Sequence, residues 1–141
     1  MTTLGESITT ALPRLRAHAE SRMTSTCTIT GAGGEPVWDD EAGEYVTPPG
    51  ATLYDGKCRL RMGNPAPQNA DAGETAWAVD RGVLSLPIDG TANVGDGATV
   101  TITGNPHDPG MVGLVLTVLA GHFQTDSTAR RLPVQVVTRD A

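Results

Sequence analysis

Two stretches of alternating sequence decide the fold: Thr24-Ser25-Thr26-Cys27-Thr28-Ile29-Thr30 and Ala98-Thr99-Val100-Thr101-Ile102-Thr103. In both, threonine occupies every second position, and small or apolar side chains occupy the positions between. Successive side chains of a strand point to opposite faces, so each stretch predicts a strand with one apolar face and one hydroxyl face. Half-buried strands of this kind are typical of antiparallel sheets.

Six further segments have the composition and spacing of strands. They are 45–47, 57–62, 76–80, 83–86, 112–119 and 132–138. In the second of these, Cys58, Leu60 and Met62 are expected to point inward, and turn dipeptides such as Asp55-Gly56 and Asp96-Gly97 separate the segments. About seven short strands at this spacing favour a small closed barrel or a sandwich. We expect a mainly β fold, a small antiparallel β-barrel with an N-terminal α-helix.

The helix is predicted before the first strand. Apolar side chains recur there at spacings of three and four and form one stripe, which consists of Leu4, Ile8, Leu12, Leu15, Ala19 and Met23. Two starts are open: a helix over about 11–22 capped by Thr10, or an earlier turn that begins at a Thr3/Glu6 capping box and bends at Pro13. We expect a helical arm over 1–23 and a barrel over 24–141, in one structural domain. The stripe should be buried on the barrel or against a neighbouring subunit.

Charge and cysteine content narrow the function classes. The chain of 141 residues carries 16 acidic and 10 basic side chains, a formal charge of -6, which disfavours non-specific binding of phosphates. No apolar run approaches the roughly 18 residues of a membrane-spanning helix, and the start lacks a signal-peptide pattern, so we expect a soluble, cytosolic product. Cys27 and Cys58 lack zinc-site spacing and are expected as buried thiols on neighbouring strands, with a disulfide as the alternative.

Groups of chemically active residues are sparse. Four acidic residues, Asp39, Asp40, Glu41 and Glu44, cluster in a glycine-containing turn and indicate a solvated hairpin tip. The histidines, His18, His107 and His122, have no accompanying nucleophile. The aromatic residues are not interleaved with basic ones, and we expect them to anchor the core: Trp38, Tyr45, Tyr54, Trp77 and Phe123. We therefore expect no enzyme activity, no cofactor and no metal site.

One long segment has no periodicity. It consists of Gly63, Asn64, Pro65, Ala66, Pro67, Gln68, Asn69, Ala70, Asp71, Ala72, Gly73, Glu74 and Thr75. A loop of this length inside a compact domain is usually functional or disordered.

A series of short motifs resembles a known family. The motifs are Leu12-Pro13-Arg14-Leu15-Arg16-Ala17, Thr26-Cys27-Thr28-Ile29-Thr30, Leu86-Pro87, Val94-Gly95-Asp96-Gly97, Asp108-Pro109-Gly110 and Thr128-Ala129-Arg130-Arg131-Leu132. Their order, over nearly the whole chain, is similar to that of the small head-to-tail connector proteins of long-tailed actinobacteriophages, specifically the head-to-tail stoppers. Gly97 departs from the pattern, because a bulky apolar residue is more usual at this position.

The resemblance implies a structural protein of the virion neck. The subunits would form a homo-oligomeric ring, a hexamer, between the portal or adaptor ring and the tail terminator or tail tube. Packaged DNA would pass through the lumen without specific binding, and segment 63–75 would be the gate that holds it. A closed ring needs two different patches on each subunit, for which the helix and exposed strand edges are candidates. Two alternatives stay open: a tail terminator that caps the tail tube, and a stand-alone β-sandwich binding module with an exposed aromatic platform.

Overall fold

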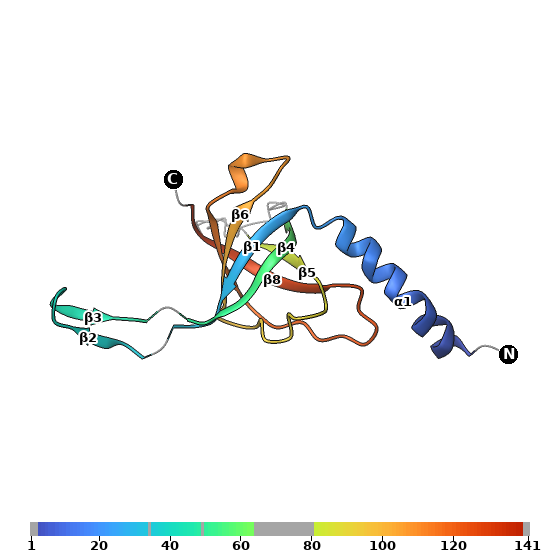
Figure 1. Ribbon diagram of the computed structural model, residues 1–141, viewed down its shortest axis with the longest axis horizontal. Coiled ribbons are helices and arrows are strands. Elements are labelled where there is room, and N and C mark those ends of the chain that lie inside the picture. The colour runs from blue at the N-terminus through green and yellow to red at the C-terminus, as the bar shows by residue number, and fades with distance from the viewer. Residues whose placement is uncertain (1–2, 34, 49, 64–80, 140–141) are drawn as a thin grey trace, which may run out of the picture.

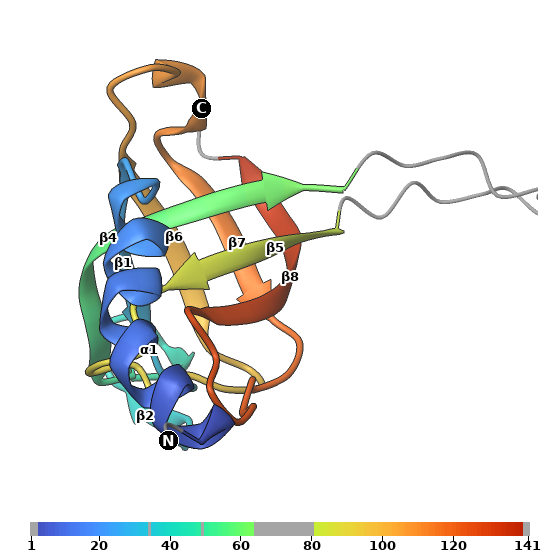
Figure 2. The ribbon, with the colours of Figure 1, turned by 90° about the vertical axis from the view of Figure 1, so that its right-hand side faces the viewer.

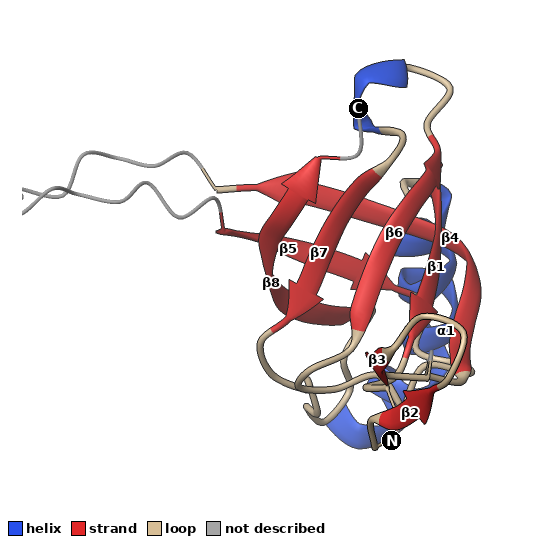
Figure 3. Ribbon diagram, turned by 90° about the vertical axis from the view of Figure 1, so that its left-hand side faces the viewer, coloured by secondary structure: helices blue, strands red, loops and turns tan. Residues whose placement is uncertain are grey.

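Six antiparallel strands form a closed barrel, as expected for a mainly β chain (Figure 1). The structure is a computed structural model that describes residues 3–33, 35–48, 50–63 and 81–139. Around the barrel the strands follow the order β1 (Ser25–Thr30), β4 (Thr52–Met62), β5 (Arg81–Leu86), β8 (Arg130–Arg139), β7 (Leu114–Val118) and β6 (Thr99–Gly104). Figure 2 shows β4 and β5 crossing in front of β6 and β7, and Figure 3 shows the barrel from the opposite side.

The alternating stretches form adjacent strands with the expected orientation. In β1, Ser25, Cys27 and Ile29 are buried, and their threonine neighbours lie on the outer face. Strand β6 pairs with β1 and buries Val100 and Ile102 against the same core. Further fully buried side chains from the other strands and from the β5–β6 connection complete the core: Leu84, Leu86, Val94, Leu116, Val118, Leu132 and Val134. The period-two pattern therefore predicted the inner face of the barrel correctly.

Strand β4 differs from the expectation at both ends. It begins at Thr52, so Asp55 and Gly56 lie within the strand, paired with Thr28 and Cys27, and the predicted turn there is wrong. Met62 at the other end is 37% exposed, because the strand has passed the core at that point, and its predicted inward orientation is wrong. The predicted strand 76–80 lies outside the described residues.

The structure also describes the turn at Gly97 and the two cysteines. Gly97 has a φ of 85°, a conformation that glycine adopts without strain, so the turn explains why a bulky residue is absent here. Cys27 and Cys58 are free, buried thiols on the paired strands β1 and β4, as expected. A hydrogen bond to Cys58, together with burial, raises the pKa of Cys27 above its ordinary value.

The N-terminal helix α1 spans Leu4–Ser21 and starts at the earlier of the two predicted positions. Thr3 is the N-cap: its Oγ1 accepts from the backbone N–H of Glu6 at 3.1 Å, and its own N–H donates to the Glu6 carboxylate at 2.8 Å. This capping box satisfies amides of the first turn and fixes the start of the helix at Leu4. The helix includes Pro13 and ends at Ser21, so the predicted start near residue 11 is wrong. Within the described residues, no helix is long and apolar enough to cross a membrane.

Two elements project from opposite sides of the barrel (Figure 1). One is α1, and the other is a hairpin of β2 (Val37–Asp39) and β3 (Glu44–Val46), which form a separate two-stranded sheet. Each of the six barrel strands is paired on both sides, since the barrel is closed. Among the described strands, the exposed strand edges that were expected as candidate contact sites therefore occur at the hairpin.

Candidate assembly surfaces

The apolar stripe of α1 is largely uncovered in the single chain. Leu4 is 78% exposed and Leu15 is 50% exposed, whereas Ile8, Leu12 and Ala19 are half-buried. Met23, one residue beyond the C-cap, is the only buried member of the stripe. The barrel of the same subunit thus covers the end of the stripe and leaves its beginning exposed.

Two polar contacts attach the second half of α1 to the barrel. The Nε of Arg16 donates to the backbone carbonyl of Ser127 at 3.1 Å. The Nζ of Lys57 lies 3.1 Å from the carboxylate of Glu20, and this is the only ion pair within the described residues. Both groups of the ion pair are partly exposed, so the pair contributes little to stability on its own. The helix is held by its C-terminal half.

A groove of about 280 Å³ separates this half of the helix from the barrel. We call it the helix groove, and its lining consists of Leu15, His18, Ala19, Arg22, Met23, Arg59, Ser85, Thr128, Ala129 and Arg131. The lining contains three arginines and no carboxylate. The lining of the helix groove therefore combines positive charge with apolar contact points on Leu15 and Ala19.

The hairpin lies in the connection between β1 and β4, and a narrow neck joins it to the barrel. Gly31 donates its N–H to the carbonyl of Ala51 at 2.8 Å, which closes the neck at the barrel. A Cβ at Gly50 would overlap the carbonyl oxygen of Gly31, and one at Gly33 would lie 2.6 Å from the carbonyl oxygen of Pro48. The two chain segments of the neck can approach this closely only because Gly33 and Gly50 have no side chain on the side that faces the opposite segment. Gly31, Gly33 and Gly50 therefore form this neck.

The hairpin exposes large apolar side chains. Val37 is 60% exposed, Trp38 51%, Tyr45 70% and Val46 41%. Trp38 and Tyr45 face each other across the strands with ring centroids 5.1 Å apart in an edge-to-face arrangement. A two-stranded sheet has no second layer to cover its faces, so these side chains stay in solvent. The prediction that aromatic residues anchor the core is wrong for this pair.

The other aromatic residues divide between core and surface. Tyr54 packs against the core and donates its hydroxyl to the carbonyl of Lys57 at 2.6 Å, as expected of a core residue. Phe123 is 76% exposed, against the expectation, because it lies over a buried arginine instead of within the barrel. Trp77 lies outside the described residues.

The hairpin tip is acidic and solvated, as predicted. Asp39 accepts from the N–H groups of Glu41 and Ala42, and Gly43 has a φ of 67° that completes the turn. The carboxylate of Asp40 accepts from the Trp38 indole N–H at 2.8 Å. Glu41 and Glu44 are exposed and have no hydrogen-bond or ion-pair partner for their carboxylates in the described structure. Across the described ranges, no three His, Cys, Asp or Glu side chains come close enough to hold a metal ion.

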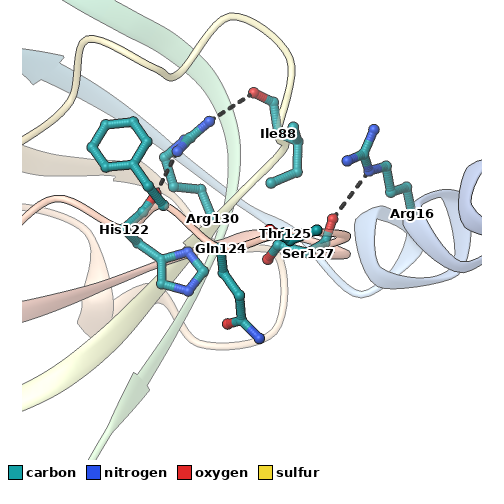
Figure 4. A pocket seen from close by; sticks show the side chains of 8 residues that line it. Arg16, Ile88, His122, Gln124, Thr125, Ser127 and Arg130 are labelled. Atoms are coloured by element: carbon teal, nitrogen blue, oxygen red, sulfur yellow. Dashed lines mark hydrogen bonds between the residues drawn. The ribbon is translucent and has the colours of Figure 1, made fainter.

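A buried arginine organises the loops beneath α1 (Figure 4). Arg130 is 7% exposed and donates to Thr91 Oγ1 at 2.9 Å, to the Ile88 carbonyl at 3.4 Å and to the His122 carbonyl. Its guanidinium carbon lies 5.2 Å from the centre of the Phe123 ring. A shallow pocket of about 390 Å³ lies beside it. The donors are used on protein carbonyl and hydroxyl oxygens, which indicates a structural role for Arg130.

The predicted gate segment lies outside the described residues, apart from its first member. Gly63 donates its N–H to the carbonyl of Arg81 at 2.8 Å, at the place where the end of β4 lies beside the start of β5. Of the remaining chemically active residues, His107 lies in a turn that the Asn105 side chain stabilises by accepting from the N–H groups of His107 and Asp108. His122 Nδ1 accepts from the Arg131 N–H at 3.3 Å. These contacts are structural ones.

The fold and its exposed elements together define a class: a small β-barrel scaffold that presents apolar surfaces on two projections. The chain belongs to DUF6093, a family of unknown function, whose model matches residues 15–135. No curated protein and no solved structure matches the chain significantly. The family match covers the barrel, the hairpin and the helix groove, and its description assigns them no activity.

Proposed function

We propose that this chain is a structural subunit of the neck of a long-tailed phage, where it forms a ring that joins the filled head to the tail as a head-to-tail stopper. One observation carries the proposal: the barrel bears two different exposed apolar surfaces, on α1 and on the hairpin, that project from opposite sides. A ring of identical subunits requires two different surfaces on each subunit. The motif order described above supplies the assignment to the phage neck.

Charge is compatible with a ring around DNA. Each subunit has a formal charge of -6, so the summed field of a ring repels the phosphate backbone instead of binding it. DNA inside such a channel can slide during packaging and ejection. The portal or adaptor ring would contact one face of the ring, and the tail terminator or tail tube would contact the other.

The sandwich alternative is wrong in its architecture, because the six strands form one closed barrel. The exposed aromatic pair does not support a sugar-binding module either, because the planes of the Trp38 and Tyr45 rings meet at 74° and form no flat platform for a sugar ring. The tail-terminator alternative would use the same kind of ring. A stopper and a tail terminator differ in which step of virion assembly fails when the protein is missing.

The test uses phage assembly with and without this chain. Filled heads produced without the protein should lose DNA to added nuclease, and purified wild-type protein added back should restore retention and tail joining. Heads that keep their DNA while tails reach irregular lengths would identify a tail terminator and overturn the stopper assignment. Normal virions made without the protein would overturn both neck roles.

A further inference from the structure

We infer that the hairpin of one subunit docks into the helix groove of the next copy of this chain. The inference rests on the proposed ring and names the two surfaces that form its repeated contact. The hairpin contributes β2, β3 and the acidic tip, and the helix groove contributes the space between α1 and the barrel. Three features of the described residues support the pairing: charge, apolar contact and geometry.

Charge is complementary between the two surfaces. Residues 35–46 contain five acidic side chains and no Lys or Arg: Glu35, Asp39, Asp40, Glu41 and Glu44. The helix groove is lined by Arg22, Arg59 and Arg131, and no carboxylate lines it. No described carboxylate forms an ion pair with these arginines. Opposite potentials of this kind steer two surfaces together and fix their register.

Apolar contact is complementary as well. The hairpin offers Trp38 and Tyr45 on one face and Val37 and Val46 on the other, and the lining of the helix groove includes Leu15 and Ala19 beside its arginines. Tryptophan, tyrosine and arginine are the residues most enriched among the strongest contributors to protein interfaces. Both surfaces therefore have the composition of an interface core with a charged rim.

The geometry favours contact between copies over contact within one chain. Figure 1 shows the hairpin and α1 extending from opposite sides of the barrel, and the structure contains no hydrogen bond or ion pair between them within the described residues. A contact from one side of a subunit to the other side of the next is heterologous, and such contacts generate rings when the rotation closes.

Duplex DNA is the competing occupant of an arginine-lined groove. It is disfavoured here because apolar side chains such as Leu15 share the lining with the arginines and because the whole subunit is negatively charged. DNA binding at the helix groove is therefore an outcome that the experiment must be able to detect.

The experiment exchanges the charges of the two surfaces in full-length protein. The hairpin variant carries Glu35→Arg, Glu41→Arg and Glu44→Arg, which change the net charge of residues 35–46 from -5 to +1 and leave the Asp39 turn and the Trp38–Asp40 bond in place. The groove variant carries Arg22→Glu and Arg59→Glu, whose side chains form no hydrogen bond in the structure. Matched controls reverse exposed charges outside both surfaces, Asp96→Arg and Arg81→Glu. Far-UV circular dichroism and thermal melting verify folding of every variant.

Light scattering coupled to size exclusion and mass photometry then measure assembly. Each charge variant alone should associate roughly a hundredfold more weakly than wild type, because like charges face each other in the contact. Mixing the two variants should restore rings, since alternating subunits place opposite charges at every contact. The controls should assemble like the wild-type chain.

Three results would overturn the inference. Wild-type rings that persist in both charge variants would refute this contact and leave the proposed ring standing. A wild-type chain that stays monomeric would refute the ring and the contact together. Binding of a fluorescent DNA duplex that the groove variant abolishes, with its self-association unchanged, would assign the helix groove to DNA.

Discussion

Replacement of Arg130 by alanine should destabilise the barrel strongly, because it removes a buried cation that bridges three loop positions. The guanidinium donates to Thr91 Oγ1 at 2.9 Å, to the His122 carbonyl and, at the longer distance of 3.4 Å, to the Ile88 carbonyl. A hydrogen bond to a charged group contributes about 1.5–3 kcal/mol. The two shorter bonds thus contribute roughly 3–6 kcal/mol before the cost of burying the charge is subtracted.

After the burial cost is subtracted, we expect a loss of about 3 kcal/mol, because the Thr91 hydroxyl and the His122 carbonyl lose the donors that Arg130 supplies. Urea unfolding followed by far-UV circular dichroism measures the loss. The Phe123→Ala variant is the matched control and should lose at most about 1 kcal/mol, because its ring is 76% exposed and contributes only the cation–π contact. An Arg130→Ala variant within about 0.5 kcal/mol of wild type would refute the structural role of Arg130.

Three further predictions concern other parts of the chain. Burial raises the pKa of Tyr54 to about 12, so the stability that its neutral phenol contributes should be intact below pH about 10 and lost as the pH rises toward 12. In urea titrations across that range Tyr54→Phe should lose less stability than wild type, and parallel losses would contradict this. Cys27 and Cys58 should react with a thiol reagent only after unfolding, and rapid labelling of the native protein would show that they are accessible. Thr3→Ala should fray the first turn of α1, at a local cost of about 1 kcal/mol, without moving the unfolding midpoint of the barrel. Hydrogen exchange separates the two effects, and a shifted barrel midpoint would mean that the whole helix is coupled to the core.

The barrel core could be predicted from sequence because its signal is local and repeated. The alternation around Cys27 and Ile29, and around Val100 and Ile102, defines a buried face that the fold preserves. The same rule applied to β8 would have found Arg130, since it lies two residues before Leu132 in the inward register. An arginine at an inward position of an alternating strand is thus a signal for a buried polar network.

The hairpin could not be predicted as an assembly surface by the same reasoning. Its strands, β2 and β3, have three residues each, too few for a period-two pattern to stand out. Aromatic residues are usually buried, and the sequence contains no direct sign that Trp38 and Tyr45 lie on a projection without a second layer. The glycine neck that sets the hairpin apart from the barrel depends on the close approach of Gly33 to Pro48 and of Gly50 to Gly31, which only the fold brings together.

The central claim is that this chain assembles into a closed ring through two different surfaces. Mass photometry of the purified wild-type protein, followed by electron microscopy of the same sample, tests this claim most directly. The expected result is one dominant species of six copies of the 14.6 kDa chain, seen as rings with an open centre. Monomers at every concentration, or an open-ended ladder of oligomers without closure, would contradict it.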